Sequence, residues 1–327
     1  MIDAHVHVWN LSVSAYAWLG PRHRVLHQTY GPERAAAALA EAGIGQAVLV
    51  QAEDSLADTA YLLDVAARHP FVAAVVGWVR LDDPPAAAAA LDRWQQAPPF
   101  RGVRHLVHDD PRDDFLRLPS VRTSLTDIAR RGLAFDVPDA WPRHLAAVAE
   151  LAMALPELTV VVDHLAKPPR GTKEMAPWSS ALAAVAAAPN TLAKLSGLQA
   201  PGQPLTAAAL RPVFDLALEL FGPRRLMYGG DWPLTVPYGG YRAAWSVYAD
   251  LIGMLTPGEQ GVAVVAYRQP HLPAARGLMK PLETAYAAAV VVVCPRLRMS
   301  LAIASSAVGT WPKTSRWRVG SATYPPV

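Results

Sequence analysis

The sequence predicts an α/β fold in which eight parallel strands close into a barrel surrounded by helices, the (β/α)8 or TIM barrel. Short apolar runs typical of buried strands alternate strictly with amphipathic stretches typical of helices. Eight such pairs fit within about 250 residues, the usual size of this barrel. The structural alternative is an open doubly wound sheet, but no predicted strand is followed by its Gly-x-Gly-x-x-Gly phosphate turn.

The predicted strands are short runs rich in Val, Ile, Leu and Ala. Because a helix follows each of them, we expect neighbouring strands to be parallel and joined by right-handed crossovers. They cover residues 2–8, 46–53, 72–79, 102–107, 133–137, 159–165, 191–198 and 225–230.

The predicted helices are bounded by residues that favour helix ends. Gly43 follows the first helix, Asp54 or Ser55 caps the second, and Pro257 follows the last. The helices cover residues 32–42, 55–69, 84–96, 120–131, 142–155, 178–188, 205–221 and 241–255.

The composition of the 327-residue chain is that of a folded globular protein, with 52% apolar and 17% charged residues. A single cysteine, Cys294, excludes an internal disulfide framework and a zinc site made of several cysteines. The longest apolar run, 285–294, is too short to cross a bilayer. The first residues lack the basic and apolar parts of an export signal, so we expect a cytoplasmic location and no membrane partner.

The charge is unevenly distributed along the chain. Residues 261–327 contain eight basic residues and one acidic residue, whereas residues 1–260 contain 22 basic and 26 acidic residues. The basic residues are scattered rather than clustered on one helical face, so we expect no nucleic acid partner. We therefore divide the chain into a barrel, residues 1–258, and an atypical basic tail, residues 259–327, which we expect to be poorly ordered.

Histidines stand where two of the predicted strands end, and in this fold the chemistry lies at the carboxyl ends of the strands. The first strand ends with His5-Val-His7, and alternation along a strand puts both imidazoles, together with Asp3, on one face. The sixth strand ends near His164. Such imidazoles can converge on a metal ion or a substrate oxygen; the alternative is a purely structural role in the core.

The eighth strand ends with Gly229-Gly230-Asp231. We expect the paired glycines to let the backbone approach a ligand closely. A carboxylate beside three imidazoles can act as a general base for water. The alternative for Asp231 is a helix cap or a turn.

Five segments, taken together and in this order, resemble amidohydrolase family 2, and within it the sugar-lactonase branch of L-fuconolactonase, L-rhamnonolactonase and 2-pyrone-4,6-dicarboxylate lactonase. The resemblance covers residues 1 to 258 and implies a TIM barrel that hydrolyses a lactone ring, with an active centre of His5, His7, His164 and Asp231. The segments are His5-Val-His7, Gly102-Val-Arg-His-Leu, Asp163-His-Leu-Ala-Lys-Pro-Pro, Lys194-Leu-Ser-Gly-Leu and Phe221-Gly-Pro-Arg-Arg-Leu-Met-Tyr-Gly-Gly-Asp-Trp-Pro.

Further residues are candidates for binding the substrate. The resemblance implies that Arg104, His105 and Lys167 hold the substrate or polarise its carbonyl group. Trp232, beside the candidate base, is placed to stack on a sugar face. Two residues at strand ends, Glu53 and Lys194, are candidates for binding hydroxyl groups or for forming salt bridges.

The metal content departs from that of binuclear amidohydrolases, which bridge two ions with a lysine or glutamate on strand four and add a histidine on strand five. This sequence has Arg104 and His105 on strand four, and Asp136 but no histidine on strand five. We therefore expect at most one divalent ion, zinc or manganese. Its ligands would be His5, His7, His164 and Asp231. Catalysis without a metal is the alternative.

The expected activity is the opening of a small-molecule lactone by a water that Asp231 deprotonates. Two alternatives stay open: a metal-dependent decarboxylase of the same superfamily, and a non-catalytic remnant with an altered C-terminus. The alternative of a non-catalytic remnant arises because the residues after Gly261 lack the ending typical of the family. We hypothesise a frameshift or a sequencing error there.

Overall fold

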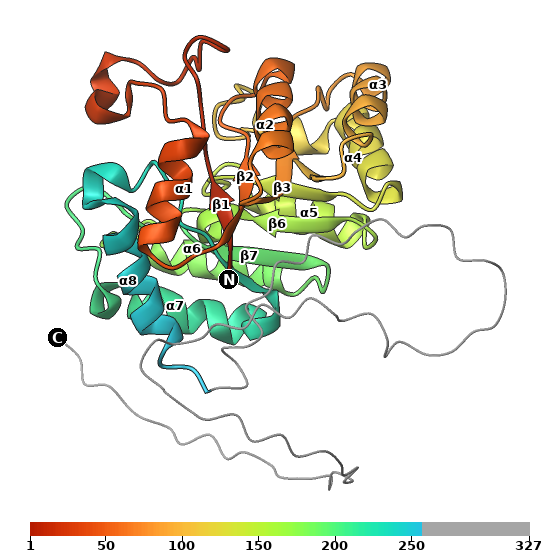
Figure 1. The fold of residues 1–327 in the computed structure, drawn as a ribbon. Coiled ribbons are helices and arrows are strands. Elements are labelled where there is room, and N and C mark those ends of the chain that lie inside the picture. Colours follow the sequence, from red (N-terminus) through yellow and green to blue (C-terminus); the bar gives the residue numbers. More distant parts are fainter. Residues whose placement is uncertain (257–327) are drawn as a thin grey trace, which may run out of the picture. The chain divides into compact units, whose positions relative to one another are not determined.

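The computed structural model describes residues 1–256, and their eight parallel strands follow one another around a single sheet in the order β1 to β8 (Figure 1). The predicted barrel is confirmed. The boundary at residue 258 and the basic tail lie outside the described residues. The strands are β1 (Ile2–Val6), β2 (Gln46–Val50), β3 (Val72–Gly77), β4 (Phe100–Arg104), β5 (Ala134–Val137), β6 (Thr159–Val162), β7 (Thr191–Leu195) and β8 (Leu226–Tyr228).

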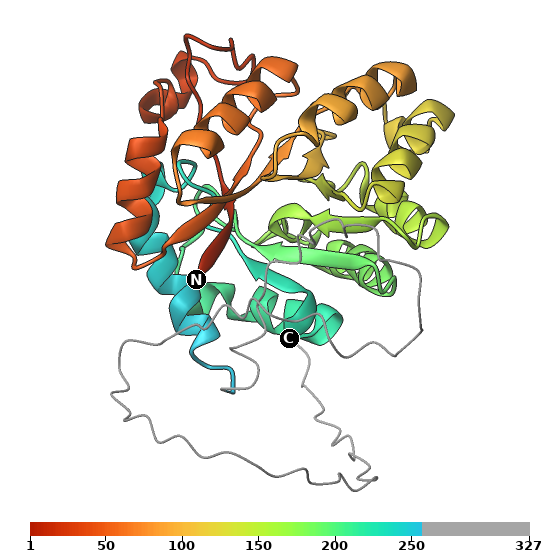
Figure 2. The ribbon, with the colours of Figure 1, turned by 45° about the vertical axis from the view of Figure 1, so that its right-hand side comes forward.

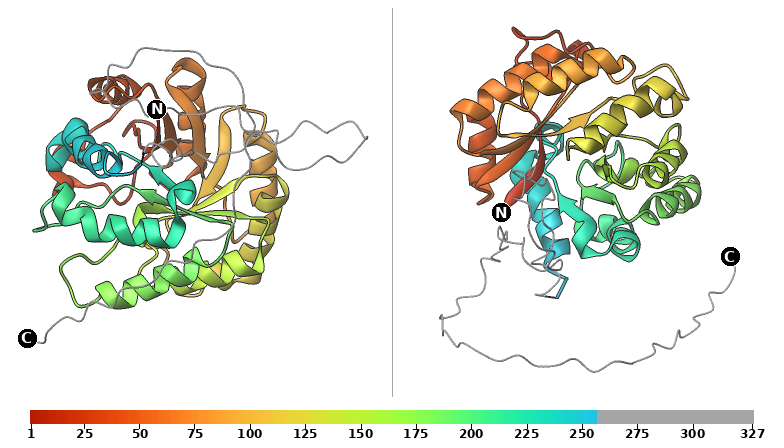
Figure 3. Two further views of the ribbon diagram at one scale, coloured as in Figure 1. Left: turned by 90° about the horizontal axis from the view of Figure 1, so that it is seen from below. Right: turned by 90° about the vertical axis from the view of Figure 1, so that its right-hand side faces the viewer.

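Eight helices alternate with the strands and lie on the outside of the barrel (Figures 2 and 3). No helix in residues 1–256 is long and apolar enough to cross a membrane. The helices are α1 (Pro32–Glu41), α2 (Leu56–Arg68), α3 (Pro84–Trp94), α4 (Pro119–Arg130), α5 (Leu145–Ala154), α6 (Met175–Ala186), α7 (Ala207–Phe221) and α8 (Gly240–Ile252).

Several helices begin at side chains that accept hydrogen bonds from the first turn. Ser55 caps α2 by accepting from the Asp58 amide, Asp83 caps α3 by accepting from Ala86, and Thr206 caps α7 by accepting from Ala209. The predicted starts of these three helices lie within two residues of the observed ones. Residues 1–256 also contain five short 3-10 helices, one of which follows β6 at Asp163–Ala166.

Most strands are two or three residues shorter at their carboxyl ends than predicted. His7, His164 and Asp231 therefore lie in the segments that follow the strands, whereas His5, Arg104 and Lys194 lie within strands. After β6, four successive residues have positive φ angles: 56° at His164, 52° at Leu165, 58° at Ala166 and 63° at Lys167. A strand requires negative φ, so the extended structure stops at Val162.

The barrel is closed by backbone contacts between β1 and the segment after β8. The amide of Asp231 donates to the carbonyl of His5 at 2.8 Å, and the amide of His7 donates to the carbonyl of Trp232 at 2.7 Å. Val6 and Trp232 form a parallel bridge. These bonds join residues that are more than 220 positions apart in the sequence and hold the two ends of the barrel together.

A bulge in β1 corrects the prediction that Asp3 shares the face of His5 and His7. Between Asp3 and Val6, β1 advances by three residues while β2 advances by two. Asp3 therefore faces the helices, where it accepts hydrogen bonds from the Tyr241 hydroxyl on α8 and from the Gly230 amide. The extra residue turns His5 into the barrel.

The inside of the barrel is filled with apolar side chains, in two clusters: Ala4, Ala134, Val161, Leu192 and Met227, and Val48, Val50, Ala74 and Val76. A much larger apolar core lies between the strands and the helices. Polar side chains reach the barrel axis only toward the carboxyl ends of the strands among the described residues, which is where the candidate site forms.

A substitution at Gly77, the last residue of β3, tests the packing between the strands and the helices. A Cβ at this position would lie 2.5 Å from Thr59 Cγ2 and 3.1 Å from Phe100 Cε2, and Thr59 is itself held by the Trp78 amide at 2.8 Å. We predict that Gly77→Ala lowers the free energy of unfolding by about 1–3 kcal/mol, measured by urea denaturation.

Gly45→Ala is the matched control, because a Cβ there has nothing within 4 Å. Equal losses of stability in the two variants would contradict this account of the barrel packing.

Candidate active site

The structure brings the four predicted residues of the active centre together. Asp231 Oδ1 lies 3.9 Å from His5 Nε2, 3.7 Å from His7 Nε2 and 3.9 Å from His164 Nε2. The Nε2 atoms of His5 and His7 are 3.0 Å apart. All four side chains are buried. Three imidazole nitrogens and one carboxylate oxygen therefore face a common point at the carboxyl ends of the strands.

Backbone geometry places each of the four residues. The β1 bulge and the closure bonds place His5 and His7 beside Asp231. His164 lies in the turn after β6 and Asp231 follows β8, both with positive φ, at 56° and 48°. Such backbone conformations are rare outside glycine and are held here by the surrounding contacts.

A layer of hydrogen bonds orients these side chains. His7 Nδ1 donates to the carbonyl of Val50 at 2.8 Å, so the lone pair of the neutral ring is on Nε2, the nitrogen that lies 3.0 Å from His5 Nε2. His164 Nδ1 lies 2.8 Å from Ser196 Oγ. Gln199 Nε2 donates to Asp231 Oδ2 at 2.8 Å. The bond from Gln199 leaves the other oxygen of Asp231 directed at the three imidazoles.

Two cations and two carboxylates form a buried network beside His5. Lys194 Nζ lies 2.5 Å from Asp136 Oδ2, 2.9 Å from Asp163 Oδ1 and 3.2 Å from His5 Nδ1. Arg104 Nε donates to Asp163 Oδ2 at 2.8 Å. Buried charges are tolerated when they are paired and hydrogen-bonded in this way. Lys194 is thus in the salt bridges that the sequence left as one alternative.

Burial keeps the imidazoles neutral. It lowers the pKa of His7 to about 3, with a further contribution from the charge of Arg104, and it lowers the pKa of His5 and His164 well below the ordinary histidine value. Burial also raises the pKa of Asp231 to about 6, against the opposing charge of Lys167. Near neutral pH the centre therefore combines neutral nitrogen donors with a carboxylate of raised basicity.

In the charged network beside the centre, neighbouring charges shift the pKa values of Asp163 and Lys194 in the direction opposite to the effect of burial. Burial alone would raise the pKa of Asp163, but Lys194, His5 and Arg104 hold it well below its ordinary range. Burial alone would lower the pKa of Lys194, but Asp136 and Asp163 raise it. Asp163 and Lys194 are therefore charged at neutral pH.

The donor set fits a divalent metal ion. The ligand atoms of His5, His7 and Asp231 lie within 4.8 Å of one another, and His164 adds a third neutral imidazole. His5, Asp163 and His164 form a second such group. Both oxygens of Asp163 already contact a cation, Lys194 or Arg104, so the first group together with His164 offers the donor atoms that are free to hold an ion.

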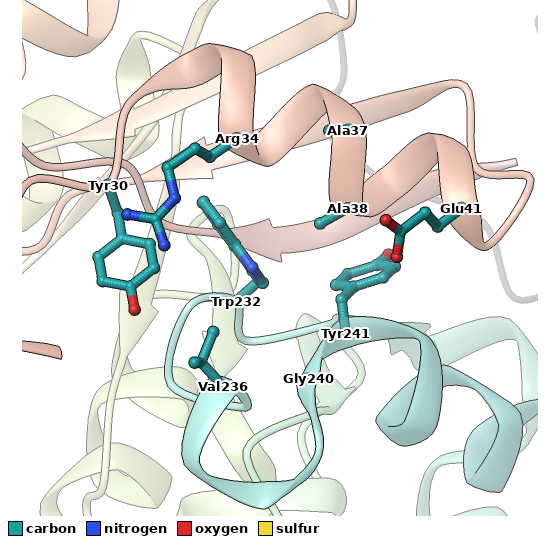
Figure 4. Close-up of a pocket in the computed structure, with 9 residues that line it drawn as sticks. All are labelled: Tyr30, Arg34, Ala37, Ala38, Glu41, Trp232, Val236, Gly240 and Tyr241. Carbon is teal, nitrogen blue, oxygen red and sulfur yellow. The ribbon is translucent and has the colours of Figure 1, made fainter. Parts of the chain in front are cut away.

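Other predicted residues lie outside this cluster. Trp232 packs edge-on against Tyr30, with ring centroids 5.4 Å apart, and lines a pocket of about 330 Å³ between α1 and α8 (Figure 4). Its ring is therefore not brought to the imidazoles. Glu53 accepts hydrogen bonds from Ser14 Oγ and the Ala17 amide, so its carboxylate holds the loop after β1.

His105 is also held away from the cluster. Its ring stacks on Phe115 at a centroid distance of 4.2 Å, and its Nδ1 accepts a hydrogen bond from the Trp78 indole at 3.2 Å. Arg104 does adjoin the centre, because it donates to Asp163, whose Oδ1 lies 3.5 Å from His5 Nδ1. Lys167 ends the turn that holds His164, and its amide donates to the His164 carbonyl at 2.9 Å. Of the substrate-binding candidates, Arg104, Lys167 and Lys194 are thus the ones that adjoin the four central residues.

The paired glycines serve a different purpose from the one predicted. A Cβ on Gly229 would lie 2.6 Å from His5 Cβ, and a Cβ on Gly230 would lie 2.2 Å from Tyr241 Cε2 and 2.4 Å from Asp3 Oδ2. These glycines let the end of β8 approach β1 and α8, which closes the barrel. The close approach that they allow is thus to β1 and α8 and not, as predicted, to a ligand.

The roles of Ser196, Gln199 and Asp163 could not be predicted from the sequence. Two of them lie inside segments quoted for the family resemblance, Asp163-His-Leu-Ala-Lys-Pro-Pro and Lys194-Leu-Ser-Gly-Leu. The family resemblance therefore points to these two segments. It does not distinguish a side chain that orients a neighbouring residue from one that packs in the core.

Comparisons with known proteins show the family of the chain. Residues 2–260 match the amidohydrolase family. The L-fucono-1,5-lactonase of Burkholderia ambifaria is 37% identical over 255 residues, which cover 76% of this chain and 86% of that protein. The L-fucono-1,5-lactonase of Burkholderia multivorans is 32% identical over 260 residues, which cover 73% and 84%.

A solved structure extends the comparison. The crystal structure of an amidohydrolase from Burkholderia multivorans with bound zinc has a TM-score of 0.72 and 29% sequence identity. The match covers 80% of this chain and 94% of that one. By sequence and by fold, the chain belongs to the amidohydrolase family.

Proposed function

We propose that this protein is a lactonase that opens the ring of a sugar-acid lactone with a water deprotonated by Asp231. The observation that carries the proposal is the convergence of Asp231 Oδ1 with three neutral imidazoles at the mouth of the barrel. The two relatives that are 37% and 32% identical to this chain are L-fucono-1,5-lactonases. We therefore propose L-fucono-1,5-lactone or a lactone of similar size and hydroxylation as the substrate.

Asp231 is suited to act as the general base. A base works best when its pKa lies near the working pH, and burial raises the pKa of Asp231 to about 6. As the water oxygen bonds to the ring carbonyl carbon, Asp231 Oδ1 takes its proton. When the bond between that carbon and the ring oxygen breaks, the same proton passes to the leaving oxygen, so that acid and alcohol groups result.

The negative charge that develops on the carbonyl oxygen requires stabilisation, and one well-placed donor contributes about 3 kcal/mol to such a step. Lys167 and Arg104 are the cations beside the centre that we propose for substrate binding and charge stabilisation. A divalent ion, zinc or manganese, held by His5, His7, His164 and Asp231 would polarise the carbonyl. Hydrolysis supported by the cationic side chains alone is the alternative.

The two other readings of the sequence have less support. A decarboxylase of the same superfamily would use a similar barrel, but the relatives at 37% and 32% identity are lactonases. A non-catalytic remnant is disfavoured by the intact geometry of the four central residues within residues 1–256.

Lactone hydrolysis is tested directly by measuring acid release from a panel of aldonolactones, including L-fucono-1,5-lactone, before and after treatment with a chelator. We predict turnover of at least one sugar-acid lactone well above spontaneous hydrolysis. With an ion at the centre, activity falls after chelation and returns with zinc or manganese. Hydrolysis at the spontaneous rate for every lactone, with and without added ion, would contradict the proposal.

Asp231→Asn tests the base. The amide has the size of the carboxylate but cannot accept a proton from water, so we predict a loss of about 10²–10⁴ in kcat, measured on the lactone turned over fastest. Asp250→Asn, on the exposed surface of α8, is the control and is expected to keep the parent activity. An Asp231→Asn protein as active as the control would exclude Asp231 as the base.

A further inference from the structure

We propose that residues 194–199, at and after the end of β7, form a positioning segment that orients the active centre without supplying a base or a metal ligand. Three of its side chains each contact a different central residue: Lys194 contacts His5, Ser196 contacts His164 and Gln199 contacts Asp231. This inference rests on the proposed function, because it assigns the residues that set the geometry of the lactonase centre.

Ser196 fixes the orientation of the His164 ring. Its hydroxyl lies 2.8 Å from His164 Nδ1, and both side chains are buried. When the hydroxyl oxygen accepts the Nδ1 hydrogen, the lone pair of His164 Nε2 is left facing Asp231 Oδ1. Gly197 permits this contact, because its φ is 59° and a Cβ there would lie 2.3 Å from His164 Nδ1.

Gln199 determines which oxygen of Asp231 faces the imidazoles. Its amide nitrogen holds Oδ2 at 2.8 Å, while Oδ1 lies within 3.9 Å of all three Nε2 atoms. Gln199 is itself buried, so water does not readily replace its hydrogen bond. Without it, the carboxylate is free to rotate about its terminal bond and to lose this arrangement.

Lys194 contacts Nδ1 of His5, on the other side of the ring from the Nε2 atom that faces Asp231. Its ammonium group lies 3.2 Å from His5 Nδ1, and Asp136 and Asp163 fix its position at 2.5 and 2.9 Å. His5 Nδ1 is also 3.5 Å from Asp163 Oδ1. The His5 ring is therefore held between this charged network and the imidazole of His7.

The position of β7 in the barrel explains why one short segment reaches all three residues. β7 pairs with β6, which leads to His164, and with β8, which leads to Asp231. Lys194 and Ser196 are two residues apart and so point to the same side of the extended chain. Beyond them, Gly197 has a positive φ that ends the extended chain, and Gln199 reaches Asp231.

The test compares Gln199→Leu, Gln199→Glu and Ser196→Ala with the parent protein. Gln199→Glu keeps the size of the side chain but replaces the donor with an acceptor, which separates hydrogen bonding from volume. Gln203→Leu is the control, because Gln203 lies in the same loop but contacts none of the central residues in the described part of the chain. The probes are Zn²⁺ affinity by chelator competition, the visible spectrum of the Co²⁺-loaded protein, kcat and KM, and the thermal midpoint.

We expect the three Gln199 and Ser196 variants to bind Zn²⁺ about 10- to 100-fold more weakly and to shift the Co²⁺ spectrum. We also expect kcat to fall at least tenfold while KM and the thermal midpoint change little. Variants that keep the parent Zn²⁺ affinity, Co²⁺ spectrum and kcat, or that change only in thermal midpoint, would overturn the positioning role. If the parent hydrolyses no lactone, the proposed function fails, whereas the Zn²⁺ and Co²⁺ measurements still decide the role of the segment.

Discussion

The hydrogen bonds that join β1 to the segment after β8 are the constraint on which the active centre depends. They connect the amide of Asp231 to the carbonyl of His5, and the amide of His7 to the carbonyl of Trp232. Three of the four central residues are thereby fixed by the closure of the barrel itself. Because Gly229 and Gly230 allow the close approach, the chemistry of the site and the stability of the fold share the same contacts.

The second constraint is electrostatic. The barrel buries Arg104 and Lys194 together with Asp136 and Asp163, and each of these cations contacts at least one of the carboxylates. This network adjoins His5 but leaves the central imidazoles neutral, because burial dominates their pKa values. The protein thus separates the charges that hold the site from the neutral donors that face its centre.

Much of this could be predicted from the sequence, for reasons that particular residues make clear. The alternation of strands and helices predicted the barrel, and His5, His7, His164 and Asp231 stood where strands were expected to end. What the sequence could not reveal was local geometry that tertiary contacts impose. The bulge that turns Asp3 outward depends on pairing with β2, and the Trp232 ring packs against Tyr30, which precedes α1. Ser196 and Gln199 needed the neighbouring strands in place before their contacts could be seen.

The most direct measurement is an anomalous difference map at the zinc absorption edge, from crystals of the protein grown with Zn²⁺. The account predicts one strong peak per chain at the mouth of the barrel, about 2.0–2.2 Å from imidazole nitrogens of the three histidines and from Asp231. A peak elsewhere, or a centre in which Asp231 points away from the imidazoles, would contradict it.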